Sequence, residues 1–209
     1  MSVKYLRRYT DLASVIYLLT ERKITLLDPR YWDDSNDSHY LRTYRDKKRL
    51  KSVLVLCFTQ ASERYHHWRV FTNGSSGVRI RFKRSDLLGA IRRVHEVRVR
   101  NVEYLTLPQL RDKALKTEDL PFLKRYPFTD EKEFRIICEL KEGKRHALDV
   151  PVPLSCIDEI ILSPWLPHAL SGDIKRLLRS IPGCAKLKIA RSTLISNEEW
   201  KNFAEELEA

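Results

Sequence analysis

Two glutamates separated by one residue, Glu131 and Glu133, are the side chains in this sequence with the clearest chemical potential. In a strand, residues two positions apart project from the same face, so we expect both carboxylates to lie beside Arg135, with Phe134 and Ile136 on the opposite face. Two like charges at this spacing repel, which raises the pKa of one carboxyl group and prepares it for catalysis. The alternative is a solvent-exposed acidic edge that Arg135 neutralises.

A second pattern is basic. Polar and apolar residues alternate strictly over Val78–Lys83, which predicts a strand with Arg79, Arg81 and Lys83 on one face, about 7 Å apart. This spacing is close to that of successive phosphates along one nucleic-acid strand. The face could be extended by three further arginines, namely Arg84, Arg92 and Arg93. The alternative is the solvated outer face of a half-exposed sheet.

Charge is distributed unevenly along the chain. The 209 residues include 39 Lys and Arg against 28 Asp and Glu, a net charge of +11, and positions 1–100 hold 22 of the basic but only 10 of the acidic residues. Such asymmetry favours a polyanionic partner, nucleic acid first and a membrane surface second, with general solubility as the alternative. The 43% hydrophobic and 32% charged content excludes a disordered or collagen-like chain.

Other side chains with binding potential give weaker signals. His66 and His67 precede Trp68, but adjacent histidines cannot easily ligate one metal and no carboxylate or cysteine lies at a ligand spacing, so no metal is expected. The four cysteines are far apart, and Cys57 and Cys138, which lie within apolar runs, are expected to be small buried side chains. No charge-free stretch approaches the roughly 20 residues of a membrane helix, and the N-terminal residues lack an apolar signal-peptide core. The sequence therefore predicts a cytoplasmic protein with no membrane partner; no protein partner can be named.

Hydrophobic periodicity predicts a single α+β domain over residues 1–209, with a mixed, mostly antiparallel sheet and flanking helices. Strands are expected at Val3–Tyr9, Ile24–Leu27, Val53–Phe58, Val78–Lys83, Val94–Tyr104, Phe134–Leu140, Ile157–Leu162 and Lys186–Ala190, with His146–Val150 as the hairpin partner of Phe134–Leu140. Helices are expected at Leu12–Glu21, Tyr40–Lys51, Leu107–Lys124 and Pro167–Ile181, with shorter ones starting at Ser85 and Ser196. Asp28–Ser38 and Thr59–Thr72 are expected to be connections without regular structure.

Short motifs along almost the whole chain resemble an uncharacterised bacterial domain family. That family reads Leu-Tyr-Lys-Tyr, Phe-Asn-Asp-Pro, Cys-Phe-Ser, Met-Trp, Gly-Val-x-Ile-x-Phe, Glu-x-Glu-x-Arg and Ile-x-Glu-Ile-Ile-x-x-Pro in order. The corresponding segments here are Leu6–Tyr9, Trp32–Asp37, Leu56–Thr59, Trp68, Gly77–Phe82, Glu131–Arg135 and Ile157–Pro164. The chain departs from the pattern at His67, where the family has Met, and at Ser38, where it has Pro.

The motif order also resembles the ADP-ribosyltransferase superfamily, which places an Arg or His on the first strand, a Ser/Thr/Tyr motif on a later one and a catalytic Glu on a later strand still. The resemblance implies that NAD, as substrate, is bound by Arg8, Tyr9, Trp32, Thr59 and Ser62. In this scheme the Arg8 guanidinium holds a ribose or phosphate, and an aromatic ring stacks on nicotinamide. Glu133 hydrogen-bonds the ribose and stabilises the oxocarbenium-like transition state, while Glu131 helps to orient the acceptor.

The function implied by this resemblance is that of an NAD-dependent ADP-ribosyltransferase-like enzyme, or an NAD glycohydrolase, acting on a nucleic acid or protein as a toxin or phage-defence effector. Two alternatives come from other classes of protein. One is a non-catalytic nucleic-acid-binding module that uses the basic first half of the chain. The other is an accessory domain of a defence system. Consumption of NAD, measured with and without DNA or RNA, separates the enzyme from the binding module.

Overall fold

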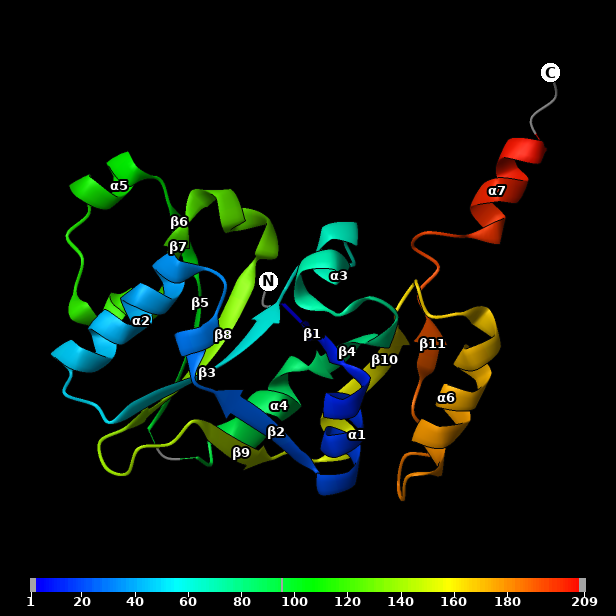
Figure 1. The fold of residues 1–209 in the computed structure, drawn as a ribbon, viewed down its shortest axis with the longest axis horizontal. Helices are drawn as coiled ribbons and strands as arrows, with labels where there is room; N and C mark the ends of the chain where they lie inside the picture. The colour runs from blue at the N-terminus through cyan, green and yellow to red at the C-terminus, as the bar shows by residue number, and fades with distance from the viewer. Residues whose placement is uncertain (1–2, 95, 207–209) are drawn as a thin grey trace.

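A computed structural model describes residues 3–94 and 96–206, and its central feature is a nine-stranded sheet with an additional two-stranded ribbon (Figure 1). The sheet runs in the order β11-β10-β4-β1-β3-β2-β9, with β8 on the other side of β3 and β5 beyond β8. Its strands are β1 (Tyr5–Asp11), β2 (Lys23–Leu27), β3 (Ser52–Thr59), β4 (Gly77–Lys83), β5 (Val97–Asn101), β8 (Glu133–Leu140), β9 (Ala147–Pro151), β10 (Ile157–Leu162) and β11 (Ile189–Arg191). All pairings in this sheet are antiparallel except that of β10 with β11, so the predicted α+β class with a mostly antiparallel sheet is confirmed.

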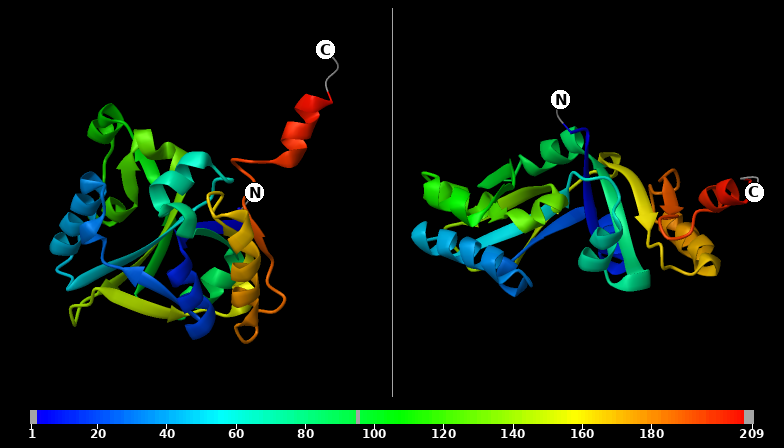
Figure 2. Two further views of the ribbon diagram at one scale, coloured as in Figure 1. Left: turned by 45° about the vertical axis from the view of Figure 1, so that its right-hand side comes forward. Right: turned by 90° about the horizontal axis from the view of Figure 1, so that it is seen from above.

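Helices cover both faces of the sheet (Figure 2). They are α1 (Leu12–Glu21), α2 (Ser35–Lys47), α3 (Tyr65–Phe71), α4 (Arg84–Ile91), α5 (Leu107–Asp112), α6 (His168–Ser180) and α7 (Glu198–Glu205). Two 3-10 segments, η3 (Thr117–Phe122) and η4 (Tyr126–Glu131), flank β7 (Leu123–Arg125), which pairs with β6 (Glu103–Leu105) in the small ribbon. No helix within the described residues combines the length and apolar character needed to cross a membrane.

The alternation of side chains along the strands gives the sheet two unlike faces. The first face is the main core, where residues such as Leu6, Leu56, Ile80 and Ile136 pack against α1 and α4. The second face carries two smaller cores, one under α2 and η3 and the other under α3. Between these two cores the second face is polar, because the alternation places charged residues there.

The sheet forks at β3. At its C-terminal end β3 pairs with β1, with Thr59 opposite Arg7. Nearer its N-terminal end it pairs with β2, with Val55 opposite Leu27. Strands β1 and β2 therefore diverge, and α1, which connects them, lies across the gap on the first face (Figure 1). Asp11 caps the N-terminus of α1, because its carboxylate accepts a hydrogen bond from the Ser14 amide at 2.7 Å.

Three expected elements are wrong in type or partner. The segment Asp28–Ser38, expected to lack regular structure, contains the start of α2, because the Asp34 carboxylate caps the amides of Asn36 and Asp37. The expected helix Leu107–Lys124 ends at Asp112; residues 113–116 are irregular, and η3 and the start of β7 follow them. Strand β9 pairs with β2, with Leu26 opposite Leu148, and not with β8 as the expected hairpin required.

Smaller differences concern the ends of elements. The expected strand Val94–Tyr104 is divided into β5 and β6, and the connection Thr59–Thr72 contains α3. Glu131 is the last residue of η4 and not part of β8, because Lys132 adopts a left-handed backbone with φ of 44°. The single-domain interpretation agrees with the continuous sheet, although α7 extends away from the body of the protein (Figure 2).

Candidate active site

Strand register aligns a strip of polar residues across the second face of the sheet. Arg7 on β1 lies opposite Arg81 on one side and Thr59 of β3 on the other, and Thr59 in turn lies opposite Glu133 of β8. Directly opposed residues project from the same face of a sheet. We call Arg7, Thr59, Arg79, Arg81, Glu133 and Arg135 the polar strip. It places guanidinium groups at one end and the predicted catalytic carboxylate at the other.

Arg135 is the centre of a buried ion network. Its side chain is fully buried. Its guanidinium donates two hydrogen bonds to Asp37, at 2.8 and 2.7 Å, and two to Glu133, at 2.8 and 2.9 Å, so both pairs are bidentate. It also donates to the carbonyl oxygen of Pro121 at 2.9 Å, and it lies over the ring of Trp32 at 5.3 Å. Removing such charges from water is costly, and the cost is offset only because every partner is paired.

Lys124 links this network to Glu131. Its ammonium lies 2.7 Å from a Glu131 oxygen, 3.6 Å from Glu133 and 3.8 Å from Asp37. The hydroxyl of Thr59 donates to the main-chain oxygen of Glu131 at 2.5 Å, which connects the end of β3 to the end of η4. Two cations are therefore shared among three carboxylates in one place, and Glu131 is the carboxylate nearest to solvent, with its side chain 14% exposed.

The pKa values of the three carboxyl groups move in different directions. Burial alone would raise the pKa of Glu133, but Arg135 and Lys124 lower it to about 2. Burial raises the pKa of Asp37 and of Glu131, and the neighbouring cations offset this only in part. Glu133 is therefore ionised at neutral pH, as expected for a group that stabilises positive charge and not for a general acid.

Three guanidinium groups lie close together at the other end of the strip. Burial and then repulsion from Arg79 and Arg81 lower the pKa of Arg7. Arg81 is paired with Asp158 at 2.5 Å and Glu159 at 3.0 Å. Arg79 is 3.7 Å from Glu63.

Of these three arginines, Arg7 has hydrogen-bond donors available for a ligand. Its guanidinium donates to the main-chain oxygen of Gln60 at 3.3 Å, and it has no ion pair with any residue that the structure describes. Nε of the buried Arg79 also lacks a hydrogen-bond partner within the described part of the chain. Such a cluster of partly unsatisfied cations destabilises the free protein and is suited to an anionic ligand.

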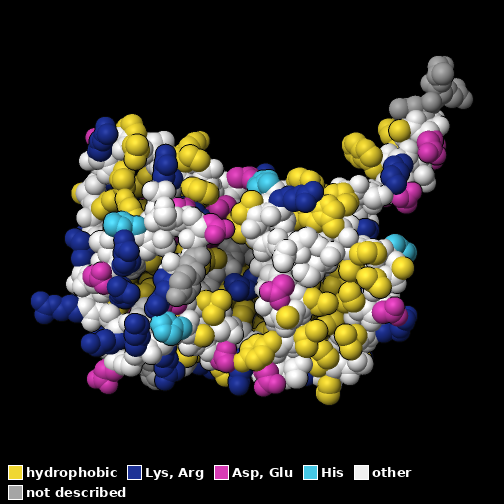
Figure 3. All heavy atoms as spheres, viewed as in Figure 1, with side chains coloured by type: hydrophobic (Ala, Val, Ile, Leu, Met, Phe, Trp, Pro, Cys, Tyr) yellow, Lys and Arg dark blue, Asp and Glu magenta, His cyan; other side chains and the backbone are white. Residues whose placement is uncertain are grey.

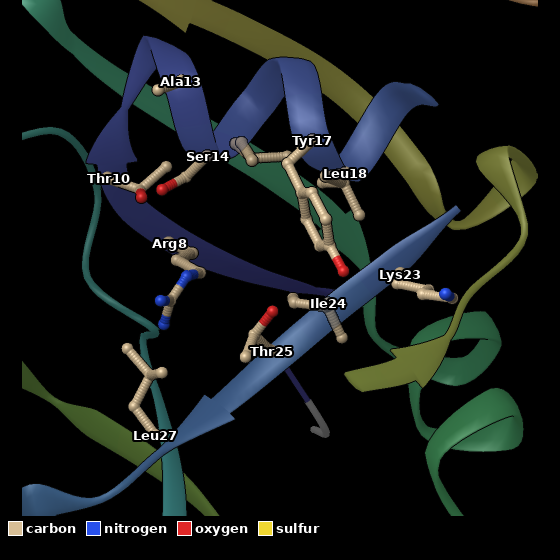
Figure 4. Close-up of a pocket in the computed structure, with 11 residues that line it drawn as sticks. Arg8, Thr10, Ala13, Ser14, Tyr17, Leu18, Lys23, Ile24, Thr25 and Leu27 are labelled. Atoms are coloured by element: carbon tan, nitrogen blue, oxygen red, sulfur yellow. The ribbon is translucent and has the colours of Figure 1, made fainter. Parts of the chain in front are cut away.

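Arg8 lies on the opposite face of the sheet, which corrects the expectation that it shares a site with Glu133. It points into a pocket of about 320 Å³ in the gap between β1 and β2, under α1 (Figure 4). The hydroxyl groups of Ser14, Tyr17 and Thr25 also line the pocket. Burial lowers the pKa of Arg8, whose guanidinium donates to the carbonyl oxygen of Cys57 at 3.4 Å. Strand alternation is the signal that separates Arg8 from Arg7.

The other predicted cofactor residues are distributed around the strip. Thr59 lies within it and Trp32 stacks on Arg135, as described above. The ring of Tyr9 packs edge-on against Trp68, at 5.0 Å between centroids, and against His67, at 5.7 Å. Ser62 is exposed in the connection before α3 and has no described contact with the network.

The predicted basic face is wrong as a single surface. Arg79 is 7% exposed and Arg81 is engaged by two carboxylates, whereas Lys83 is exposed. Arg84 begins α4 and lies over the ring of Phe134 at 4.8 Å. The exposed Arg92 and Arg93 follow α4, which packs on the other face of the sheet. Surface Lys and Arg side chains gather instead around α2 (left in Figure 3).

Sequence reasoning missed three members of the site, namely Arg7, Asp37 and Lys124. Asp37 is 98 positions away from Arg135 in the chain, so no local pattern connects them. Lys124 was expected within a helix, whereas it lies on β7. Alternation along β1 could have identified Arg7, because it separates the faces of Arg7 and Arg8.

Acid should weaken the fold through Glu133. Its pKa falls from 4.5 to about 2 on folding, so its contribution to stability is complete above pH 4.5 and is lost as the pH falls toward 2. Between pH 5 and pH 2.5, we expect the wild type to lose about 1–3 kcal/mol more of its free energy of unfolding than Glu133→Gln loses. Urea unfolding at a series of pH values measures this difference. Parallel curves for the two proteins would contradict it.

Comparisons with known proteins assign the chain to no family. No protein-family model matches the chain, and no curated protein matches it. Two solved structures are similar to it in fold. One is Thermus sp. 2.9 DarT in complex with NAD+, with a TM-score of 0.47 and 11% identity, covering 92% of this chain and 96% of that one. The other is the same DarT in complex with ADP-ribosylated ssDNA, with a TM-score of 0.47 and 10% identity, covering 91% and 94%.

Proposed function

We propose that the protein transfers ADP-ribose from NAD to a nucleic acid and that the polar strip is its NAD site. The observation that carries the proposal is the register that places Arg7, Thr59 and Glu133 side by side on three adjacent strands. A cation, a hydroxyl group and a carboxylate that is ionised at neutral pH are thereby arranged in a line. The motif order along the chain, described above, supports the same activity.

The arginine end of the strip would bind the diphosphate of NAD. A diphosphate presents two negative charges. Among the described residues Arg7 has no ion pair, and Nε of Arg79 has no hydrogen-bond partner, although Arg79 lies 3.7 Å from Glu63. Guanidinium groups form bidentate hydrogen bonds with phosphate oxygens, which fix both the position and the orientation of the ligand. Binding would also relieve the repulsion that lowers the pKa of Arg7.

The carboxylate end would promote loss of nicotinamide. The bond between ribose C1′ and the nicotinamide nitrogen breaks, nicotinamide leaves with the electron pair, and the ribose gains oxocarbenium character. An ionised carboxylate beside the ribose stabilises that positive charge. Glu133 is held ionised, and Glu131, at the edge of the network, is placed to orient the acceptor. The acceptor atom then bonds to C1′ and gives up a proton.

A nucleic-acid acceptor is supported by the positive charge of the protein, which is concentrated in residues 1–100. We further propose that such a modification of nucleic acid serves a toxin or phage-defence role. The same charge also favours the second candidate, a nucleic-acid-binding module that performs no chemistry. The two functions differ in whether NAD is consumed.

The proposal predicts release of nicotinamide from NAD and a mass gain on an oligonucleotide. In Arg7→Gln we expect the KM for NAD to rise about 10–100-fold, because a charged hydrogen bond to phosphate contributes about 1.5–3 kcal/mol. Because this contact is made equally in the ground and transition states, kcat should change little. Arg176→Gln, which alters an exposed arginine on α6, is the matched control. Oligonucleotide binding without any nicotinamide release would contradict the enzyme and support the binding module.

A further inference from the structure

Two adjacent histidines of α3 and an aspartate of η4 meet at one point beside the polar strip. The side chains of His66, His67 and Asp130 place one potential ligand atom each within 4.8 Å of one another. The sequence argued against a metal for two reasons: adjacent histidines do not easily ligate one ion, and no carboxylate lies near them along the chain. In the fold, however, one nitrogen of each imidazole lies within 4.8 Å of the other and of an Asp130 oxygen. The fold supplies Asp130 from a segment more than sixty positions away.

His67 is the unusual member of this group. Its side chain is fully buried, yet neither of its ring nitrogens has a hydrogen-bond partner within the described part of the protein. Buried polar groups are nearly always paired, because an unpaired one costs about 1–3 kcal/mol. The rings of Tyr9, Phe71 and His66 pack around it, and Asp130 is the acidic residue that faces it. A metal ion would satisfy one ring nitrogen directly.

The other two side chains are already oriented toward the same point. His66 Nε2 contacts one oxygen of Asp130, while Arg64 holds the other oxygen of that carboxylate at 2.7 Å. A metal ion would take the place of the proton between His66 and Asp130, and Arg64 would remain as the outer partner that fixes the carboxylate. Such outer partners are typical of metal sites.

We propose that His66, His67 and Asp130 bind a divalent transition-metal ion of the zinc type. Two imidazoles and one carboxylate are a donor set that Zn²⁺, Co²⁺ and Ni²⁺ accept, whereas Mg²⁺ and Ca²⁺ prefer oxygen ligands. Ligands at about 2.0–2.1 Å from Zn²⁺ require only a modest contraction of the present arrangement. A fourth position remains open on the solvent side, since the His66 side chain is 52% exposed.

Bound metal would join α3 to η4, and Glu131 follows Asp130 directly in η4. The ion would therefore restrict the segment that carries Glu131 at the edge of the polar strip. This consequence is independent of the NAD chemistry, because it requires only that η4 and α3 be linked.

Metal binding can be measured without any assay of activity. The tag-free protein, freed of metal with a chelator, is titrated with Co²⁺ while visible absorption is recorded, and then with Zn²⁺ in competition with a chromogenic chelator. We expect one ion per chain, visible absorption typical of tetrahedral Co²⁺, and a Tm that rises by several degrees with Zn²⁺. Absence of binding at micromolar Zn²⁺ would overturn the proposal.

Variants separate this site from other histidines. His66→Gln and Asp130→Asn each remove a ligand on a partly exposed side chain, so both should fold and should weaken Zn²⁺ binding by at least about 10–100-fold. His146→Gln, which alters a histidine 61% exposed on the far side of the fork, is the control. Unchanged affinity in His66→Gln and Asp130→Asn, or an equal loss in the control, would place the bound ion elsewhere and refute the assignment.

Discussion

Arg135→Met should destabilise the protein by about 3–5 kcal/mol, the largest effect on stability expected from any single substitution in the site. The methionine fills most of the volume of the arginine but leaves two buried carboxylates, Asp37 and Glu133, without the cation that pairs with them. The Lys124 ammonium lies 3.8 Å from Asp37 and 3.6 Å from Glu133, so it cannot replace the two bidentate contacts that Arg135 makes.

Urea unfolding at pH 7 measures this loss. Arg100→Gln is the matched control, because Arg100 pairs with Asp119 at 2.9 Å but is 44% exposed, and such surface pairs contribute about 0–1 kcal/mol. The triple variant Arg135→Met, Asp37→Asn, Glu133→Gln should recover part of the stability, because it removes the unpaired charges together with their partner. Equal losses for Arg135→Met and Arg100→Gln would show that the network is not the buried ion cluster described here.

Glu133→Gln should lower the rate of nicotinamide release by at least about a hundredfold, because the amide keeps the shape of the side chain but cannot stabilise positive charge on the ribose. Glu131→Gln should reduce transfer to the oligonucleotide more than it reduces nicotinamide release, because the proposal assigns it to the acceptor. Both measurements use NAD with and without an oligonucleotide.

Loss of folding has to be distinguished from loss of chemistry in this test. Glu139→Gln is the control, because Glu139 lies on the same strand as Glu133 and also accepts a hydrogen bond from an arginine, Arg98, at 3.1 Å, but lies outside the polar strip. It should retain near-wild-type turnover. Circular dichroism and the midpoint of unfolding report whether Glu133→Gln remains folded at the assay temperature. A folded Glu133→Gln with wild-type turnover would refute its assignment as the catalytic carboxylate.

Strands with strong local patterns were predictable from the sequence. Val53–Phe58 and Phe134–Leu140 are too short for buried helices and are bounded by turn residues, and they form β3 and β8 with ends within one residue of those expected. The same local information failed where long-range contacts decide the structure. His146–Val150 follows Phe134–Leu140 closely enough for a hairpin, yet the sheet pairs β9 with β2 because Leu26 and Leu148 complete the main core there.

The sequence by itself determined the α+β class and the basic first half of the chain, and it predicted the glutamate pair as the candidate catalytic group. The tertiary structure decided which charges meet. It brought Asp37 to Arg135, placed Asp130 beside His66 and His67, and put Arg7, not Arg8, on the face that holds Glu133. The physical reason is that alternation along a strand is local, whereas strand register and the packing of η4 on α3 depend on residues dozens of positions apart.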